Sequence, residues 1–280
     1  MHAMWQGAGK SYRRSWLVPC ALLFLALNGA AQARDLPSLP APGVSWDWQL
    51  SRPLNLFAKV RVMDLDPDLI SPRQARRLGA RNVYLICYVS VGTWENWRAD
   101  GKRFPRRLLG RSLAEWPDER FLDIRRVEIL LPIMRARFAR CKRLGFQAVE
   151  ADNLDLHDQR TGFALRAEDV VRYARALAEL AHGMGLAIAQ KNVPELTVEL
   201  SSFMDFAVVE ECFTQGWCGK MRPYLDRNRP VLATEYGHHQ PHAWRACAQA
   251  KRLGISLIFK RRALDAWRRD CADVLTGGYR

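Results

Sequence analysis

Hydrophobic residues between Trp46 and Lys260 gather in short runs that alternate with longer amphipathic stretches. Several runs carry bulky apolar residues at consecutive positions, which is typical of strands buried on both faces of a parallel sheet. The pattern predicts eight strands, at 46–50, 58–64, 82–91, 148–153, 187–192, 206–212, 231–236 and 256–260.

The segments between these strands predict helices at 124–144, 167–182, 194–204 and 243–253. Gly145, Gly183 and Gly254 each stand at a predicted helix end, and a strand run follows within a few residues. This repeated unit indicates an α/β protein, and eight strands favour a single (β/α)8 TIM-type barrel. A doubly wound sheet is the alternative fold. No G-x-G-x-x-G follows a strand, so no dinucleotide site is predicted.

The N-terminal segment has the features of a cleavable signal peptide. Lys10, Arg13 and Arg14 precede the apolar stretch 16–27, and a small-x-small site ends at Ala33. We expect a signal peptide at 1–33, a Pro-rich linker at 34–45 and a barrel domain at 46–280, in a secreted or periplasmic protein. No later apolar run is long enough to predict a membrane span.

Composition excludes a disordered chain and a coiled coil, because 49% of the 280 residues are hydrophobic and 26% are charged. The net charge of +14 raises the hypothesis of an anionic partner such as nucleic acid. The basic residues are spread over several predicted helices, however, which is typical of a solvated exterior. We therefore expect no nucleic-acid partner.

Polar residues concentrate where the predicted strands end, the part of an α/β barrel that carries its chemistry. Carboxylates alternate there with aromatic residues, as in clefts that bind carbohydrate: aromatic faces stack on sugar rings, and paired carboxyl groups cleave glycosidic bonds. A locally acidic mouth is expected on a basic protein. The predicted site residues are Trp48, Asp64, Tyr88, Ser90, Trp94, Glu150, Asp152, Asn153, Asp155, Lys191, Asn192, Glu210, Glu211, Glu235 and Tyr236.

A set of ordered motifs resembles glycoside hydrolase family 114, the endo-α-1,4-polygalactosaminidase type. The motifs are WDWQL at 46–50, ICYVSVGTWENWR at 86–98, WPDERFLDIR at 116–125, VEADNLD at 149–155, TGF at 161–163, KN at 191–192, EECF at 210–213 and EY at 235–236. The resemblance implies a secreted enzyme that hydrolyses α-1,4-linked galactosamine or N-acetylgalactosamine polymers of biofilms and cell surfaces. It implies no cofactor, and we expect a monomer without stable membrane insertion.

The resemblance also implies which residues act. The family's proposed catalytic carboxylates correspond to Asp152 and Glu210, while the other site residues line the same cleft. We expect Glu210 to be the acid, because apolar Val208 and Val209 beside it would raise its pKa. The chain departs from the family pattern at Ala151, Val193 and Val209, Glu211 replaces a glutamine, and Arg261 stands where an acid often follows Lys260.

The tryptophans and the possible metal ligands are separate from the catalytic residues. Trp46, Trp48, Trp94 and Trp97 are candidate sugar platforms, although Trp97, like Trp116, is rather expected to be a packing residue. The oxygen-rich segment 152–158 and the histidines of the segment 238–242 match no established metal motif, so no metal site is predicted.

The cysteines suit an oxidising compartment. The family pattern implies the pairs Cys212–Cys218 and Cys247–Cys271. Cys87 in a strand and Cys141 in a helix are predicted to be buried free thiols.

Two other functions are consistent with such a barrel. A non-catalytic carbohydrate-binding protein would not need both Asp152 and Glu210. A metal-dependent polysaccharide deacetylase would be sensitive to chelators.

Overall fold

The computed structural model describes residue 2 and residues 36–237 and 243–276. Apart from residue 2, the predicted signal peptide lies outside the described residues. So do His238, His239 and His242.

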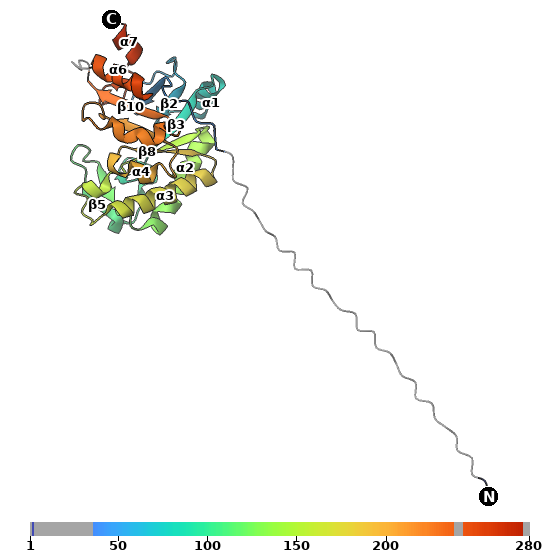
Figure 1. Cartoon of the computed structure of the whole chain (residues 1–280). Coiled ribbons are helices and arrows are strands. Elements are labelled where there is room, and N and C mark those ends of the chain that lie inside the picture. The colour runs from blue at the N-terminus through green and yellow to red at the C-terminus, as the bar shows by residue number, and fades with distance from the viewer. Residues whose placement is uncertain (1, 3–35, 238–242, 277–280) are drawn as a thin grey trace. The chain divides into compact units, whose positions relative to one another are not determined.

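Eight parallel strands form the barrel-shaped sheet, and all eight lie where strands were predicted (Figure 1). Most begin or end one to four residues inside the predicted limits, and the last two match them. This arrangement confirms the α/β barrel. The strands, in their order around the sheet, are β1 (Trp46–Gln49), β2 (Val62–Leu65), β3 (Tyr84–Ser90), β7 (Ala148–Asp152), β8 (Ala187–Lys191), β9 (Phe206–Glu210), β10 (Val231–Tyr236) and β11 (Ser256–Lys260).

The barrel closes between β11 and β1 through contacts other than a regular strand ladder. Trp46 Nε1 donates to the Ser256 carbonyl at 2.9 Å, and the Lys260 ammonium lies 2.8 Å from Asp47 Oδ1. A short antiparallel strand, β12 (Arg268–Asp270), pairs with β11 at this seam. Arg268 of β12 also donates to the Trp46 carbonyl.

Alternation along the strands decides which side chains reach the barrel interior. Ala148, Ala187 and Phe206 belong to the apolar cluster at the interior base, together with Trp46, Val62 and Ile86. The residues four positions further along β7, β8 and β9 have the same orientation. They are Asp152, Lys191 and Glu210, so local strand geometry brings all three together.

Helices cover the outside of the sheet, where a second and larger apolar cluster is buried. In Figure 1, α2 and α3 run side by side, and α6 and α7 lie together. Among the described residues, no helix is both long and apolar enough to cross a membrane. The helices are α1 (Pro72–Ala80), α2 (Val127–Leu144), α3 (Ala167–Gly183), α4 (Thr197–Leu200), α5 (Arg222–Leu225), α6 (Ala243–Leu253) and α7 (Cys271–Leu275).

Several helical segments differ from prediction, and α1, α5 and α7 lie outside the predicted ranges. The helix expected at 194–204 is a 3-10 turn, Pro194–Leu196, followed by the single turn of α4. α1 was missed because five of its nine residues are Arg, Gln or Gly and only Ala75 and Leu78 are buried. A capping box at Ser71 and a proline at the first position nevertheless start this helix.

A small antiparallel sheet, also not predicted, is inserted between β3 and α2. It consists of β4 (Thr93–Glu95), β6 (Glu119–Leu122) and β5 (Leu109–Ser112), in that order. Its strands of three or four residues are too short to produce a recognisable alternation of polar and apolar positions.

Three disulfides tie the barrel together. Cys212–Cys218 and Cys247–Cys271 confirm the pairs implied by the family pattern. The expectation of free thiols at Cys87 and Cys141 is wrong, because these cysteines form a disulfide between β3 and α2. Helix α2 packs on β3 and places the two Cα atoms 6.0 Å apart, within bonding range.

Removing the disulfide between β3 and α2 is expected to destabilise the protein more than removing the short-range one. The Cys87–Cys141 bond closes a sequence separation of 54 residues, and Cys212–Cys218 closes one of 6. On loop entropy, replacing both cysteines with Ala should lower the free energy of unfolding by about 4 kcal/mol for the first pair and about 2 kcal/mol for the second. Denaturant titration of the two double variants measures this, and equal losses would contradict it.

Candidate active site

A buried lysine occupies the centre of the C-terminal end of the barrel. Lys191 Nζ, on β8, lies 2.8 Å from Asp152 Oδ1 and 2.8 Å from Glu210 Oε2. It also lies 3.5 Å from Glu150 Oε1 and 4.8 Å from the ring centre of Trp48. One cation therefore joins three carboxylates of the neighbouring strands β7 and β9.

Hydrogen bonds from neutral side chains orient two of these carboxylates, those of Asp152 and Glu210. Tyr88 OH donates to Asp152 Oδ2 at 2.9 Å, and the Asn153 amide donates to the same oxygen at 3.2 Å. Tyr236 OH donates to Glu210 Oε1. Both carboxylates are thus held in defined orientations at the barrel mouth.

The residues that follow these strands have left-handed backbones. Asn153, Asn192 and Glu211 come directly after β7, β8 and β9, with φ values of 62°, 48° and 53°. Such conformations are uncommon for residues other than glycine and concentrate at functional sites. They turn the chain sharply after Asp152, Lys191 and Glu210. Gly92 allows a close approach here, because a Cβ at that position would lie 1.7 Å from the Asn153 carbonyl oxygen.

The charge state of Glu210 differs from the expectation. Burial alone would raise its pKa, as predicted from Val208 and Val209. The charge of Lys191 and the hydrogen bonds from Lys191, Tyr236 and Asn192 outweigh burial and bring the pKa of Glu210 below its usual value. Glu210 is therefore an ionised carboxylate in the resting protein.

A second pair of carboxyl groups lies deeper in the barrel. Asp64 of β2 and Glu150 of β7 are completely buried. Within the described residues their oxygens have no hydrogen-bond donor, apart from the Lys191 ammonium 3.5 Å from Glu150 Oε1, so a proton shared by the two acids is the donor that the pair lacks. Burial raises the pKa of Glu150 to about 7 and that of Asp64 well above its usual range. Glu150 thus contacts Lys191 from inside the barrel, and neither Asp64 nor Glu150 lines the cleft.

Replacing Asp64 with Asn is expected to stabilise the protein at pH 8 and to have little effect at pH 5. In the unfolded chain the Glu150 carboxyl loses its proton near its ordinary pKa of 4.5, whereas in the folded chain it keeps the proton up to about pH 7. The free energy of unfolding therefore falls as the pH rises from about 4.5 through 7. The neutral amide mimics the protonated acid and removes much of this loss, about 1–3 kcal/mol. Thermal unfolding of both proteins between pH 5 and 8 measures the difference. A difference that does not grow with pH would contradict the shared proton.

An open cleft of about 770 Å³ lies over the Lys191 cluster. Eight acidic and three basic side chains line it, so the mouth is acidic although the chain is basic. Of the predicted site residues, nine line this cleft: Trp48, Tyr88, Asp152, Asn153, Asp155, Lys191, Asn192, Glu210 and Tyr236.

The remaining predicted residues lie away from the cleft. Ser90 is buried and bonds to Thr93 and Asn153 behind Asp152. Glu211 pairs with Arg262 at 3.1 Å. Trp94 and Glu235 stabilise the loops around them. Trp94 donates to the Gly101 carbonyl, and Glu235 accepts bonds from the backbone of residues 213–214.

Sequence reasoning missed several acids that line the cleft, among them the buried Glu95 and Glu119. They face each other as partners in the β4–β6 ladder. Burial raises the pKa of Glu119 to about 7 and raises that of Glu95 in spite of its ion pair with Arg98. The WENWR and WPDE motifs contain both residues, but the unpredicted sheet concealed their position.

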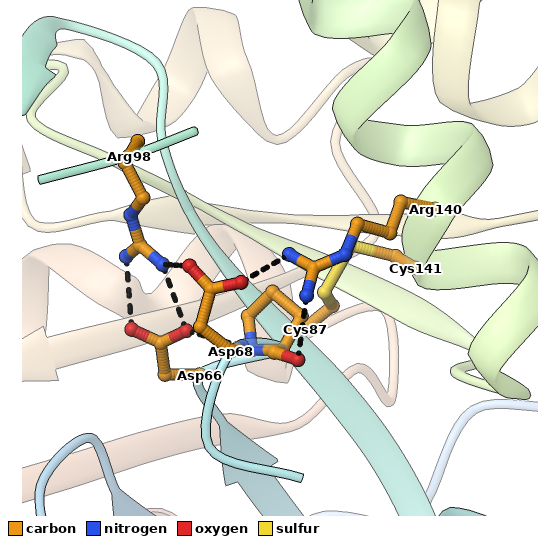
Figure 2. Close-up of a disulfide and its surroundings, with 7 residues drawn as sticks. Asp66, Asp68, Cys87, Arg98, Arg140 and Cys141 are labelled. Atoms are coloured by element: carbon orange, nitrogen blue, oxygen red, sulfur yellow. Dashed lines mark hydrogen bonds and ion pairs between the residues drawn. A yellow bond between two sulfur atoms is a disulfide. The ribbon is translucent and has the colours of Figure 1, made fainter. Parts of the chain in front are cut away.

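An ionic network anchors this part of the cleft to the barrel, as Figure 2 shows. Arg98 binds Asp66 at 2.8 Å and Asp68 at 2.6 Å, and both aspartates follow β2. Arg140 of α2 binds Asp68 from the other side at 2.6 Å. The Cys87–Cys141 disulfide lies beside this network, so β2, β3 and α2 are tied together next to the site.

The tryptophans that are exposed in the cleft are not those that were expected to bind sugar. Trp97 and Trp116, predicted to pack, are 53% and 56% exposed and line the cleft. Trp46 is buried at the barrel base, and the face of Trp48 is occupied by Lys191.

One group of side chains in the described residues could hold a cation. His157 Nε2 lies 3.1 Å from Glu195 Oε1 and 3.6 Å from Asp158 Oδ2. The group is not part of the cleft lining, and ion pairs already account for its contacts.

Solved structures with similar folds include several carbohydrate-active enzymes. Ega3 of Aspergillus fumigatus, crystallised with galactosamine, is 26% identical, with a TM-score of 0.80 over 86% of this chain and 100% of that one. The glycoside hydrolase domain of PelA from Pseudomonas aeruginosa is 17% identical, with a TM-score of 0.64 over 82% of this chain and 99% of that one. At 17% identity, the PelA likeness concerns the fold alone.

Trehalulose synthase MutB, in its R284C form, is 10% identical with a TM-score of 0.53, over 80% of this chain and 65% of that one, and also shares only the fold. A comparison with curated proteins finds no significant match. A family model, glycoside-hydrolase family GH114, matches residues 27–276. Because this match spans nearly the whole chain, the protein belongs to glycoside hydrolase family GH114.

Proposed function

We propose that the protein is an endo-acting hydrolase of α-1,4-linked galactosamine polymers, with Asp152 and Glu210 as its catalytic pair. The observation that carries the proposal is the placement of these two carboxylates on one lysine at the floor of an open, acidic cleft. The likeness to Ega3, whose crystal structure contains galactosamine, supports the sugar class.

The charge of the cleft suits an amino sugar. A galactosamine unit with a free amine is a cation at neutral pH. The eight acidic side chains of the cleft outnumber the three basic ones, so the electric field favours a cationic chain over a neutral or acidic one. An open cleft, rather than a closed pocket, also allows a polymer to bind along its length and be cut internally.

The spacing of the pair favours a retaining reaction. Asp152 Oδ1 and Glu210 Oε2 each lie 2.8 Å from Lys191 Nζ, so these oxygens are separated by no more than twice that distance. Carboxyl groups about 5–5.5 Å apart are typical of retaining glycosidases, and pairs about 6.5–9.5 Å apart of inverting ones. One carboxylate would attack the anomeric carbon while the other group protonates the departing oxygen, and water would then release the sugar.

Lys191 would hold this pair ready. Its charge keeps Glu210 ionised and orients Asp152, so a nucleophile is present without prior loss of a proton. The three disulfides support our further proposal that the protein acts outside the cytoplasm.

The test is incubation of the protein with α-1,4-galactosamine polymer, followed by mass spectrometry of the products. Short oligosaccharides are expected from the protein and none from its Asp152→Asn variant. Fully N-acetylated polymer and an uncharged α-glucan serve as comparison substrates, and treatment with a chelator should leave the rate unchanged. Loss of acetate without chain cleavage, or binding without any product, would overturn the proposal.

A further inference from the structure

We propose that Trp97 and Trp116 form an aromatic platform that binds sugar units of the polymer at a distance from the bond that is cut. This inference rests on the proposed function, since it identifies where the rest of the polymer lies. Both side chains are more than half exposed, although tryptophan has the largest apolar surface of any residue. They are also the only exposed large hydrophobic residues of the described chain that line the cleft.

The strand register brings the two tryptophans to the same rim. Glu95 pairs with Glu119 at the end of the β4–β6 ladder. Beyond it, Asn96 N donates to the Asp118 carbonyl at 3.2 Å, and the Asn96 side chain donates to Asp118 Oδ1 at 2.7 Å. The two segments therefore continue side by side, and both Trp97 and Trp116 line the cleft that they border.

The backbone that carries the platform is held in place before any ligand binds. Arg98, directly after Trp97, binds Asp66 and Asp68 in the network of Figure 2 and also binds Glu95. The Trp116 carbonyl accepts a hydrogen bond from Glu119 N, which closes the turn that carries this side chain. A backbone that is already ordered loses little conformational entropy on binding, so this arrangement suits recognition.

The chemistry of the platform fits an amino-sugar chain. The flat apolar face of an indole packs on the C–H face of a sugar ring, and its π electrons attract a nearby ammonium group. Glu115, exposed beside Trp116 and also lining the cleft, adds a partner for that ammonium. Trp48 is less suited to this task, because Lys191 lies over its ring inside the barrel.

Binding to the polymer tests the platform separately from catalysis. In the Asp152→Asn background, Trp97→Ala and Trp116→Ala are each expected to weaken binding to α-1,4-galactosamine polymer about tenfold in affinity electrophoresis. Trp97→Phe should retain most of the affinity, because it keeps an aromatic face. Trp244→Ala is the matched control: Trp244 is 62% exposed on α6, away from the cleft lining, and its loss should not change binding. Far-UV circular dichroism checks that each variant is folded.

Activity with substrates of different length gives a second measurement. In the otherwise unmodified enzyme, both Trp→Ala changes should raise KM for the polymer about tenfold, while kcat/KM for the shortest cleavable oligosaccharide stays within about twofold. Folded variants that bind and cleave the polymer like the parent would overturn the platform. Equal losses with long and short substrates would also overturn it, because they indicate a role at the cleaved bond.

Failure of the proposed function gives a different result. If the unmodified protein neither binds nor cleaves the galactosamine polymer, the same variants are tested on a panel of other polysaccharides. Weaker binding by both Trp→Ala variants to a polysaccharide that the parent binds would support the platform alone. Binding of no polysaccharide by the parent, or unchanged binding by the variants, would overturn it.

Discussion

Replacing Asp152 with Asn, or Glu210 with Gln, is expected to lower kcat for polymer cleavage about 10²–10⁴-fold while the protein stays folded. Each change keeps the shape of the side chain and removes its charge, so the reaction loses either its nucleophile or its acid. Both carboxylates contact Lys191, and neither can replace the other across the cleft. Glu199→Gln is the control, because Glu199 is an exposed acid on α4, and its rate should match the unmodified enzyme.

The anomeric form of the first product tests the spacing argument. A retaining enzyme releases the α anomer from an α-linked polymer, and proton NMR during the first minutes detects it before mutarotation. Azide supplied to the variants Asp152→Ala and Glu210→Ala then shows which residue is the nucleophile and which is the acid. It should give a β-glycosyl azide with the variant lacking the nucleophile and an α-glycosyl azide with the variant lacking the acid. Initial release of the β anomer would contradict the retaining mechanism.

Lys260→Met is expected to lower the free energy of unfolding by about 3–5 kcal/mol. Lys260 is completely buried, and its ammonium binds Asp47 and the Asp265 carbonyl at 2.8 Å each. Burial lowers the pKa of Lys260 even though Asp47 is adjacent. Removing the lysine leaves a buried carboxylate without its cation at the seam between β11 and β1.

A double-mutant cycle separates the pair from the packing around it. Adding Asp47→Asn to Lys260→Met removes the uncompensated charge, so we expect the double variant to regain about half of the loss. Arg222→Met, which breaks the exposed pair with Asp226, is the control and should cost less than about 1 kcal/mol. Urea unfolding measures all four proteins. A cost for Lys260→Met as small as that of the control would show that the seam does not depend on this ion pair.

The sequence predicted those parts of the molecule that depend on local pattern. Apolar runs placed all eight barrel strands, because each strand is buried on both faces. Strand ends then predicted Asp152, Lys191 and Glu210, since a parallel barrel brings those ends together. The charge of Glu210 was predicted wrongly because it depends on Lys191 across the barrel and not on its neighbours in the chain.

The rest depends on three-dimensional relations that the linear pattern does not contain. Asp64 and Glu150 have the same strand periodicity as cleft residues, and only the register between strands places them one layer deeper. The bond between Cys87 and Cys141 depends on how α2 packs on β3. Trp94 and Trp97 are three residues apart, yet the turn after the short strand β4 directs one inward and the other to the cleft.

The inserted sheet β4–β6 has a consequence for how such enzymes diversify. Residues 93–122 contain both tryptophans of the proposed platform and the acids Glu95 and Glu119, but neither Asp152 nor Glu210. On the proposed function, the residues that bind the polymer through the platform and the residues that cleave it would therefore lie in separate stretches of the sequence. Mutations confined to the insert would then change which polysaccharide is bound while Asp152 and Glu210 stay the same, so this segment is the one to exchange when a new specificity is sought.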